Sequence, residues 1–292
     1  MLGAIIGDMV GSIYEFNNVK RKPRELLRSG CRMTDDSVMT LAVADGVMTA
    51  FHGMGREGWM QDAERRARMQ GEMCASIRAF GRKYPDVGYG GRFQRWLRSN
   101  DSEAYGSWGN GSAMRVSYAA WAAASEAEAA MLAELSARVT HTHPLGIKGA
   151  QVVAGCIYRL RQGMGKDELH RYVASYYDMG FTLDEIRASY YFDESCEGTV
   201  PQAVMAFLES ESFEDALKLA ISIGGDSDTL AAIAGSLAEA FWPIPPELAH
   251  FALQRLDAFL LDVLRETAEA AHIEHVLRLI RYRLCFSGGG VL

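Results

Sequence analysis

Hydrophobic residues recur along most of the chain at the three- and four-residue spacing of amphipathic helices, and strict alternation is almost absent. The pattern therefore predicts an all-α protein. The predicted helices span residues 1–16, 35–51, 57–83, 92–98, 113–124, 126–140, 146–161, 167–177, 183–190, 199–209, 212–223, 229–241, 246–264 and 273–283, with a further short helix around residues 25–28. No change of composition marks a linker, so we expect residues 1–292 to form one compact domain, an orthogonal bundle of many helices.

One long segment, residues 86–116, interrupts this pattern with Gly, Ser, Asn and aromatic residues and contains a single short amphipathic stretch. Loops of this length in compact domains are usually functional. Residues 105–115 run directly into a helix, where glycine-rich backbone can hold a phosphate group through its N–H groups. An ordinary turn into the helix is the alternative. Trp108 in this loop suits either stacking on a nucleobase or packing in the core.

The first predicted helix carries glycines four residues apart, at Gly3, Gly7 and Gly11. Glycine is costly inside a helix, so this stripe indicates a face on which another helix approaches closely. Asp8 and Glu15 are seven residues apart and would share one face. For Asp8, a solvated or capping role is as good an interpretation as a functional one.

Two acidic clusters lie near opposite ends of the chain, each where a helix is predicted to begin. They consist of Thr34, Asp35 and Asp36 and of Asp226, Asp228 and Thr229. Carboxylates and hydroxyls at a helix start can simply cap its free N–H groups. Each cluster holds more of them than capping requires, and four converging carboxylates would need a cation. Their hard oxygen atoms suit Mg²⁺, Mn²⁺ or Ca²⁺ better than zinc.

The histidines and cysteines are weaker candidates for metal ligands than the acidic clusters. His141 and His143 are two residues apart, but no further His or Cys lies at zinc-like spacing, so hydrogen-bonded or stacking histidines are the better interpretation. The five cysteines are scattered without a CxxC motif, which indicates reduced thiols in a reducing compartment.

Charge and composition narrow the class of protein. Of 292 residues, 49% are hydrophobic, and the net charge is −7, which argues against disorder and against general nucleic-acid binding. The first residues lack a cationic leader, and no apolar run of about 18 residues occurs, so we expect a cytoplasmic protein without a membrane span. Residues 17–33 are basic and form either a solvated surface or a region that attracts an anionic substrate.

Four stretches together resemble the ADP-ribosylglycohydrolase family, which includes the dinitrogenase reductase-activating glycohydrolase and the ADP-ribosylhydrolases. They read GAIIGDMVGSIYEF, MTDDSVMTLAVADG, GSWGNGSAMRV with THTHPLGIKGA, and GGDSDTLAAIAGSLAEAFWP. They follow the family order from residue 3 to about residue 243. Ser227 replaces a Thr that is common in the last motif, a mild change.

The resemblance implies a compact all-α fold with two Mg²⁺ or Mn²⁺ ions at the base of a cleft. The motifs assign metal binding to Thr34, Asp35, Asp36, Asp226, Asp228 and Thr229. They place Glu15 beside the metals and the scissile bond. They assign binding of the pyrophosphate and adenine to the glycine-rich loop, and lining of the adenosine end to His141. The implied substrate-binding residues are therefore Gly106, Ser107, Trp108, Gly109, Asn110 and His141.

The implied activity is metal-dependent hydrolysis of the bond between ADP-ribose and a modified protein side chain, or a small ADP-ribose conjugate. Glu15 would act as acid, as base or by stabilising charge, and Asp35 would assist as base. Arginine, serine, a nucleobase and O-acetyl-ADP-ribose remain open as acceptors. A non-catalytic ADP-ribose-binding protein and a metal-dependent nucleotide phosphohydrolase are the alternatives.

Overall fold

The computed structural model describes residues 1–99 and 103–287, with side chains through residue 282. It confirms the all-α prediction, because the described residues form helices and no strand, apart from one isolated bridge between Gly109 and Ser195. The helices are α1 (Leu2–Gly11), α2 (Asp35–Met54), α3 (Ala63–Lys83), α4 (Gly91–Arg98), α5 (Gly111–Met114), α6 (Ser117–Ala122), α7 (Glu126–Arg138), α8 (Pro144–Arg161), α9 (Lys166–Ala174), α10 (Leu183–Arg187), α11 (Cys196–Glu209), α12 (Phe213–Ser222), α13 (Ser227–Phe241), α14 (Pro246–Arg255), α15 (Ala258–Ala270) and α16 (Glu274–Ser287).

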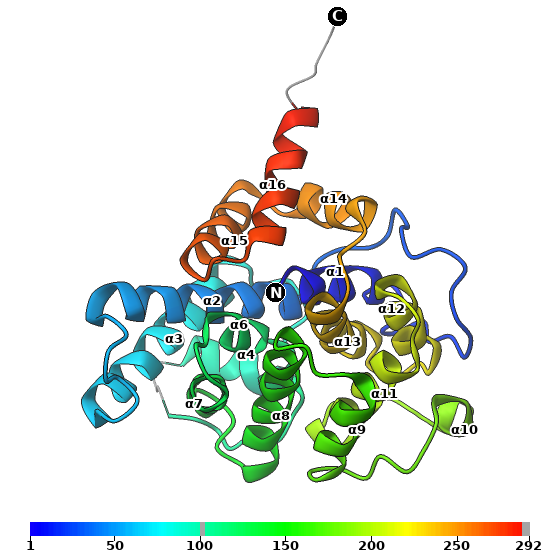
Figure 1. The fold of residues 1–292 in the computed structure, drawn as a ribbon, viewed down its shortest axis with the longest axis horizontal. Coiled ribbons are helices and arrows are strands. Elements are labelled where there is room, and N and C mark those ends of the chain that lie inside the picture. The colour runs from blue at the N-terminus through cyan, green and yellow to red at the C-terminus, as the bar shows by residue number, and fades with distance from the viewer. Residues whose placement is uncertain (100–102, 288–292) are drawn as a thin grey trace, which may run out of the picture.

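The pair α1 and α13 forms the centre of the molecule (Figure 1). The predicted glycine stripe is the reason they pack so closely. A Cβ atom on Gly7 would lie 2.0 Å from the Ala231 carbonyl oxygen, and one on Gly3 would lie 2.2 Å from that of Gly235. Only hydrogen fits at these positions, so the stripe fixes how α1 sits on α13.

Other helices surround this pair. Helices α8, α11 and α12 pack against α13, while α2 packs against α3 and α15 and also contacts α1. Every residue from Ser227 to Glu239 of α13 is buried as a result. The first residues of α2 and α13 and the chain leaving α1 therefore meet inside the molecule.

Several helix boundaries differ from the prediction for local reasons. The first helix ends at Gly11, because Ser12 donates to the Met9 carbonyl at 2.8 Å and the chain turns, which places Glu15 in a loop. The third helix begins only at Ala63, after Asp62 accepts hydrogen bonds from two N–H groups of its first turn.

The short helix predicted around residues 25–28 does not form, and two other predicted helices are each divided in two. Residues 113–124 form α5 and α6, and residues 246–264 form α14 and part of α15. The second break comes at Asp257, whose carboxylate accepts from the Leu260 N–H at 2.9 Å and so begins a new helix.

No helix in the described part of the chain is long and apolar enough to cross a membrane. Cys31, Cys74, Cys156 and Cys196 are free thiols, in agreement with the sequence interpretation. Cys285 falls outside the residues whose side chains are described.

Candidate metal centre and its cleft

Asp8 organises the start of α2 from a different helix. Its buried carboxylate accepts from the Thr34 N–H at 2.9 Å, the Thr34 hydroxyl at 2.6 Å and the Ser37 N–H at 3.0 Å, and also from the Ser37 hydroxyl. Thr34 occupies the N-cap position but makes no capping bond of its own. The capping interpretation of Asp8 is therefore right, although the helix it caps is α2 rather than its own.

Because Asp8 supplies this cap, the carboxylates of the first acidic cluster are not needed for it. At α13, Asp226 occupies the N-cap position but makes no side-chain capping bond. Asp228 Oδ1 accepts from the Thr229 N–H at 3.0 Å, but capping does not account for the other carboxylates, and simple capping is the wrong interpretation for Asp226.

The structure brings the two acidic clusters together. The Thr229 hydroxyl donates to Asp36 Oδ2 at 3.2 Å, and the Thr34 hydroxyl lies 3.4 Å from Asp228 Oδ2. Asp36 Oδ1 is buried and has no hydrogen-bond partner among the described residues. A buried carboxylate oxygen without a donor is costly unless something positive lies beside it.

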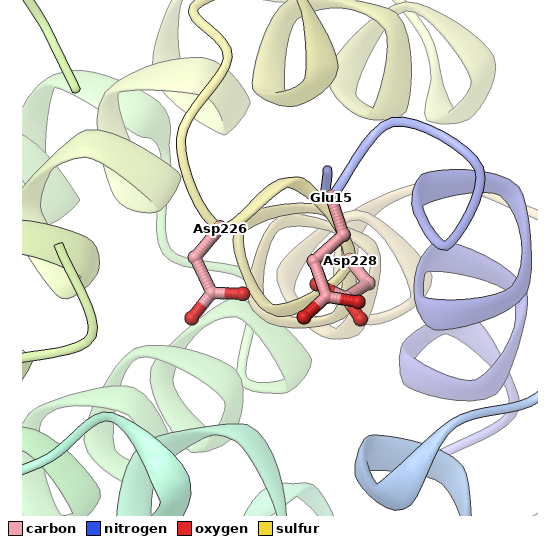
Figure 2. A group of neighbouring side chains, drawn as sticks. All are labelled: Glu15, Asp226 and Asp228. Carbon is pink, nitrogen blue, oxygen red and sulfur yellow. The ribbon is translucent and has the colours of Figure 1, made fainter. Parts of the chain in front are cut away.

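Glu15 joins the second cluster from the loop after α1. Ligand atoms of Glu15, Asp226 and Asp228 all lie within 4.8 Å of one another. Figure 2 shows the three side chains at the start of α13, with Glu15 reaching across from the neighbouring loop. This spacing is compatible with a shared divalent cation.

The electrostatics of the cluster are those of crowded acids. Burial, and then the neighbouring Asp228, hold the pKa values of Asp35 and Asp36 well above the ordinary aspartate value. Burial and Asp228 likewise raise the pKa of Glu15 to about 8, and burial raises the pKa of Asp226 to about 6. Carboxylates so close together in a buried place favour either protons or cations.

The donor set fits a hard divalent cation. The grouped ligand atoms, from Glu15, Asp226 and Asp228, are all carboxylate oxygens, and no histidine or cysteine belongs to the group found among the described residues. Mg²⁺ and Mn²⁺ prefer such oxygen ligands. The unpartnered Asp36 oxygen is the clearest single sign that a cation fits here.

A cleft of about 410 Å³ opens above this cluster. Its base is formed by Glu15, Asp35, Asp36, Asp226, Asp228 and Thr229. Thr34 lies beneath and does not line the cleft, because its hydroxyl donates to Asp8. Five of the six predicted metal ligands thus face the same space.

The predicted substrate loop forms one wall of this cleft. Ser107, Trp108, Gly109, Asn110 and His141 all line it, whereas Gly106 lies next to it in a turn with a φ of +66°. The loop contacts the metal side through Asn110, whose amide donates to Asp226 Oδ2 at 2.7 Å. The wall and the base of the cleft are therefore held in one hydrogen-bonded unit.

The two histidines have different environments. His141 is buried, its Nδ1 lies 2.7 Å from the Thr140 hydroxyl, and burial holds its pKa well below the usual value, so the ring is neutral. His143 caps α8 by accepting from the Leu145 N–H at 3.2 Å, and its ring lies 5.6 Å from that of Trp108. These contacts confirm that both histidines are hydrogen-bonded, while the rings of His143 and Trp108 are tilted by 59° and do not stack face to face.

The sequence did not reveal a further segment of the cleft wall, which lies beside the substrate loop. Residues 192–195 line the cleft, and this segment is tied to the substrate loop by the Asn110 N–H donating to the Glu194 carbonyl at 2.7 Å. The sequence has no periodicity or motif there that could have revealed it. Asn18 was also missed, although it accepts from the Gly225 N–H at 2.6 Å and so fixes the turn before Asp226.

The profile of the family described as ADP-ribosylglycohydrolase matches residues 1–277. The chain belongs to the ADP-ribosylglycohydrolase family. The match includes both acidic clusters, the cleft wall and the loop that carries Glu15.

Individual members of the ADP-ribosylglycohydrolase family are distant relatives. ADP-ribosylhydrolase ARH3 of Mus musculus is 24% identical, with 83% of this chain and 82% of that protein covered. ADP-ribosyl-[dinitrogen reductase] glycohydrolase of Rhodospirillum rubrum is 25% identical, with 92% of each covered. ADP-ribosylarginine hydrolase Tri1 of Pseudomonas putida is 27% identical over 85% of this chain and 71% of that protein.

A solved structure titled "ADP-ribosylglycohydrolase-related protein complex" has the same fold. Its TM-score is 0.58 with 22% identity, and 97% of each chain is covered. The all-α architecture is thus shared along nearly the whole chain.

Proposed function

We propose that this protein is a metal-dependent hydrolase that cleaves the glycosidic bond between ADP-ribose and a modified side chain, of the arginine or serine type, or a related ADP-ribose conjugate. The observation that carries the proposal is the meeting of the two acidic clusters at the base of a cleft whose wall is the Ser107–Asn110 loop. Family membership and the printed activities of the relatives support it.

Asp35, Asp36, Asp226, Asp228 and Thr229 would hold two divalent cations, Mg²⁺ or Mn²⁺, with Thr34 contributing from beneath. Bound there, the cations would orient and polarise the vicinal hydroxyls of the ribose that is released. Asn110 keeps Asp226 in place through its 2.7 Å hydrogen bond.

The remaining residues bind the rest of the substrate. Trp108 is 49% exposed and presents a face on which adenine can stack. Ser107 and Gly109 flank Trp108 in the chain and line the same cleft, so we assign them the pyrophosphate. His141 is buried and neutral, which suits the uncharged adenosine end.

Hydrolysis breaks the bond between the anomeric carbon and the acceptor nitrogen or oxygen, and adds water oxygen to that carbon. Glu15 is half-buried, lines the cleft and reaches the second acidic cluster from the loop after α1, so we assign it the transfer of a proton to the leaving acceptor. Asp35, also half-buried, takes the proton from the attacking water.

The location is part of the proposal. The described cysteines are free thiols, and three of them are buried, as expected of a protein in a reducing compartment. We therefore place the protein in the cytoplasm.

The test is a panel of substrates carrying ADP-ribose on arginine, on serine or on acetate, with release of free ADP-ribose measured by mass spectrometry. We expect turnover that stops with a chelator and returns with Mg²⁺ or Mn²⁺. Asp228→Asn should lower the rate at least about 100-fold, whereas the exposed Asp167→Asn should keep it. Tight ADP-ribose binding without turnover, or release of inorganic phosphate, would replace the proposal by one of the two alternatives.

A further inference from the structure

A second cavity lies beside the cleft. It has a volume of about 580 Å³. Its lining residues, which we call the basic pocket, are Tyr14, Val19, Arg21, Lys22, Pro23, Arg24, Glu25 and Arg28. It shares no lining residue with the cleft, yet Tyr14 and Glu15 are consecutive, so the two openings lie on either side of one short stretch of chain.

The segment that forms the basic pocket is positively charged, whereas the whole chain is negatively charged. Residues 20–32 contain six lysines and arginines and one acidic residue, although the whole chain has a net charge of −7. A cluster of positive charges on an otherwise negative protein attracts negatively charged partners.

Not all of these cations are engaged within the protein. Lys22 pairs with Asp215 of α12 at 2.7 Å, and Arg28 interacts with the Tyr14 hydroxyl. Arg21 and Arg24 are exposed and form no ion pair with any residue that the structure describes. Two guanidinium groups at the basic pocket are thus free to bind carboxylates.

The loop that carries these arginines is fixed at several points. Lys20 donates to the Ile223 carbonyl at 2.6 Å and Asn18 donates to the Gly225 carbonyl at 2.9 Å, which attaches the loop to the turn before Asp226. Further along, Leu26 is buried, and Arg255 donates to the Cys31 carbonyl at 3.3 Å. Figure 1 shows this blue loop running outside α12.

We propose that the basic pocket docks an acidic segment of the protein whose modified side chain enters the cleft. The inference rests on the proposed function, which assigns the leaving acceptor to Glu15, the residue that follows Tyr14 of the pocket in the chain. A side chain held at Glu15 leaves its own backbone outside, within reach of the adjoining pocket. Arginine pairs with carboxylates through two parallel hydrogen bonds, so acidic residues near the modified position match Arg21 and Arg24.

The test compares three substrates with the double variant Arg21→Glu/Arg24→Glu. One is an ADP-ribosylated peptide with acidic neighbours, one is the same peptide with neutral neighbours, and one is a small ADP-ribose conjugate. We expect kcat/KM for the acidic peptide to fall at least about tenfold, mainly through KM, and the other two values to stay unchanged. The milder Arg21→Gln/Arg24→Gln should show a smaller loss in the same direction.

Arg171→Glu is the matched control, because Arg171 is exposed on α9 and lines neither cavity. It should not change the preference for the acidic peptide. An unchanged preference in the double variant, or an equal loss on the small conjugate, would overturn the docking proposal.

Binding of the unmodified acidic peptide, followed by fluorescence anisotropy, separates this proposal from the proposed function. The wild type should bind this peptide more tightly than the neutral one, and added salt or the double variant should abolish the difference. That result would hold even if no substrate were hydrolysed. Equal binding of both peptides by the wild type would contradict docking while leaving hydrolysis intact.

Discussion

Asp8 connects α1, α2 and the candidate metal centre through one buried carboxylate. It accepts from two backbone N–H groups and two hydroxyls at the start of α2. The position of Asp35 and Asp36 depends on these bonds, because both residues belong to the turn that Asp8 caps. Asp8 is therefore a positioning residue that does not itself line the cleft.

Asp8→Ala should lower the free energy of unfolding by about 3 kcal/mol, because it leaves buried donors without an acceptor. It should also weaken Mn²⁺ binding by displacing the start of α2. Urea denaturation and calorimetric titration with Mn²⁺ would measure the two effects. Asp8→Asn keeps one oxygen acceptor and should lose less stability.

Asp45→Asn on the same helix is the control, since Asp45 accepts from the Ser76 hydroxyl at 2.6 Å and does not line the cleft. Its Mn²⁺ affinity should match the wild type. If Asp8→Ala also binds Mn²⁺ like the wild type, Asp8 is only a structural cap.

Individual site residues could be predicted from the sequence where they lie together in a short motif. Asp35, Asp36, Asp226 and Asp228 are recognisable because each pair lies within three residues of the chain. Partnerships across the chain could not be predicted, such as the bond from Asn110 to Asp226. Nothing in the local sequence specifies which distant side chain will lie opposite.

Helices α1 and α13 determine how the Glu15 loop meets the second acidic cluster. Gly11 ends α1 directly against the start of α13, where an added Cβ would lie 2.5 Å from the Ser227 carbonyl oxygen. Close contact along the glycine stripe brings the loop after α1 to Asp228. The glycine stripe thus allows close packing of α1 on α13 and also positions Glu15 at the candidate metal centre.

Gly7→Ala should destabilise the protein by at least about 3 kcal/mol, because the new methyl group would overlap the backbone of Ala231. The matched substitution Gly71→Ala, at an exposed position of α3 where nothing lies within 4 Å of an added Cβ, should stabilise the protein by roughly 0.5–1 kcal/mol through better helix propensity. Thermal and urea unfolding would measure both. Equal effects of the two variants would show that α1 and α13 do not pack this closely.

Helix positions were predictable where amphipathic periodicity was long and uninterrupted, as in α2 and α8. Breaks were missed where one polar residue redirects the chain. Asp257 begins α15 inside a continuous apolar pattern, because its carboxylate binds a backbone N–H that the helix would otherwise leave free. Hydrophobic periodicity alone does not show where a side chain will replace a backbone hydrogen bond of the helix and end it.

Across the whole molecule, the first and last parts of the described chain meet at Glu239. This buried carboxylate of α13 accepts from the Met1 ammonium group, from the Gly3 N–H at 2.8 Å, and lies 2.9 Å from His275 of α16. Burial alone would raise the pKa of Glu239, but the Met1 charge and His275 lower it to about 2.

Because this pKa is below the ordinary value of 4.5, the stabilisation is fully present above about pH 4.5 and is lost as the pH falls toward 2. Between pH 6 and pH 3, the wild type should lose roughly 2 kcal/mol more stability than Glu239→Gln. Urea unfolding at both pH values measures this difference. Glu266→Gln, an exposed change on α15, should follow the wild type, and an identical pH dependence of Glu239→Gln would contradict the assignment.

The proposed function requires two divalent cations bound between the N-termini of α2 and α13. A crystal of the protein soaked with Mn²⁺ and ADP-ribose tests this directly through an anomalous difference map at the manganese edge. We predict two peaks among Asp35, Asp36, Asp226, Asp228 and Thr229, with the ribose hydroxyls beside them. ADP-ribose bound in the cleft with no anomalous peak at these residues would contradict the account.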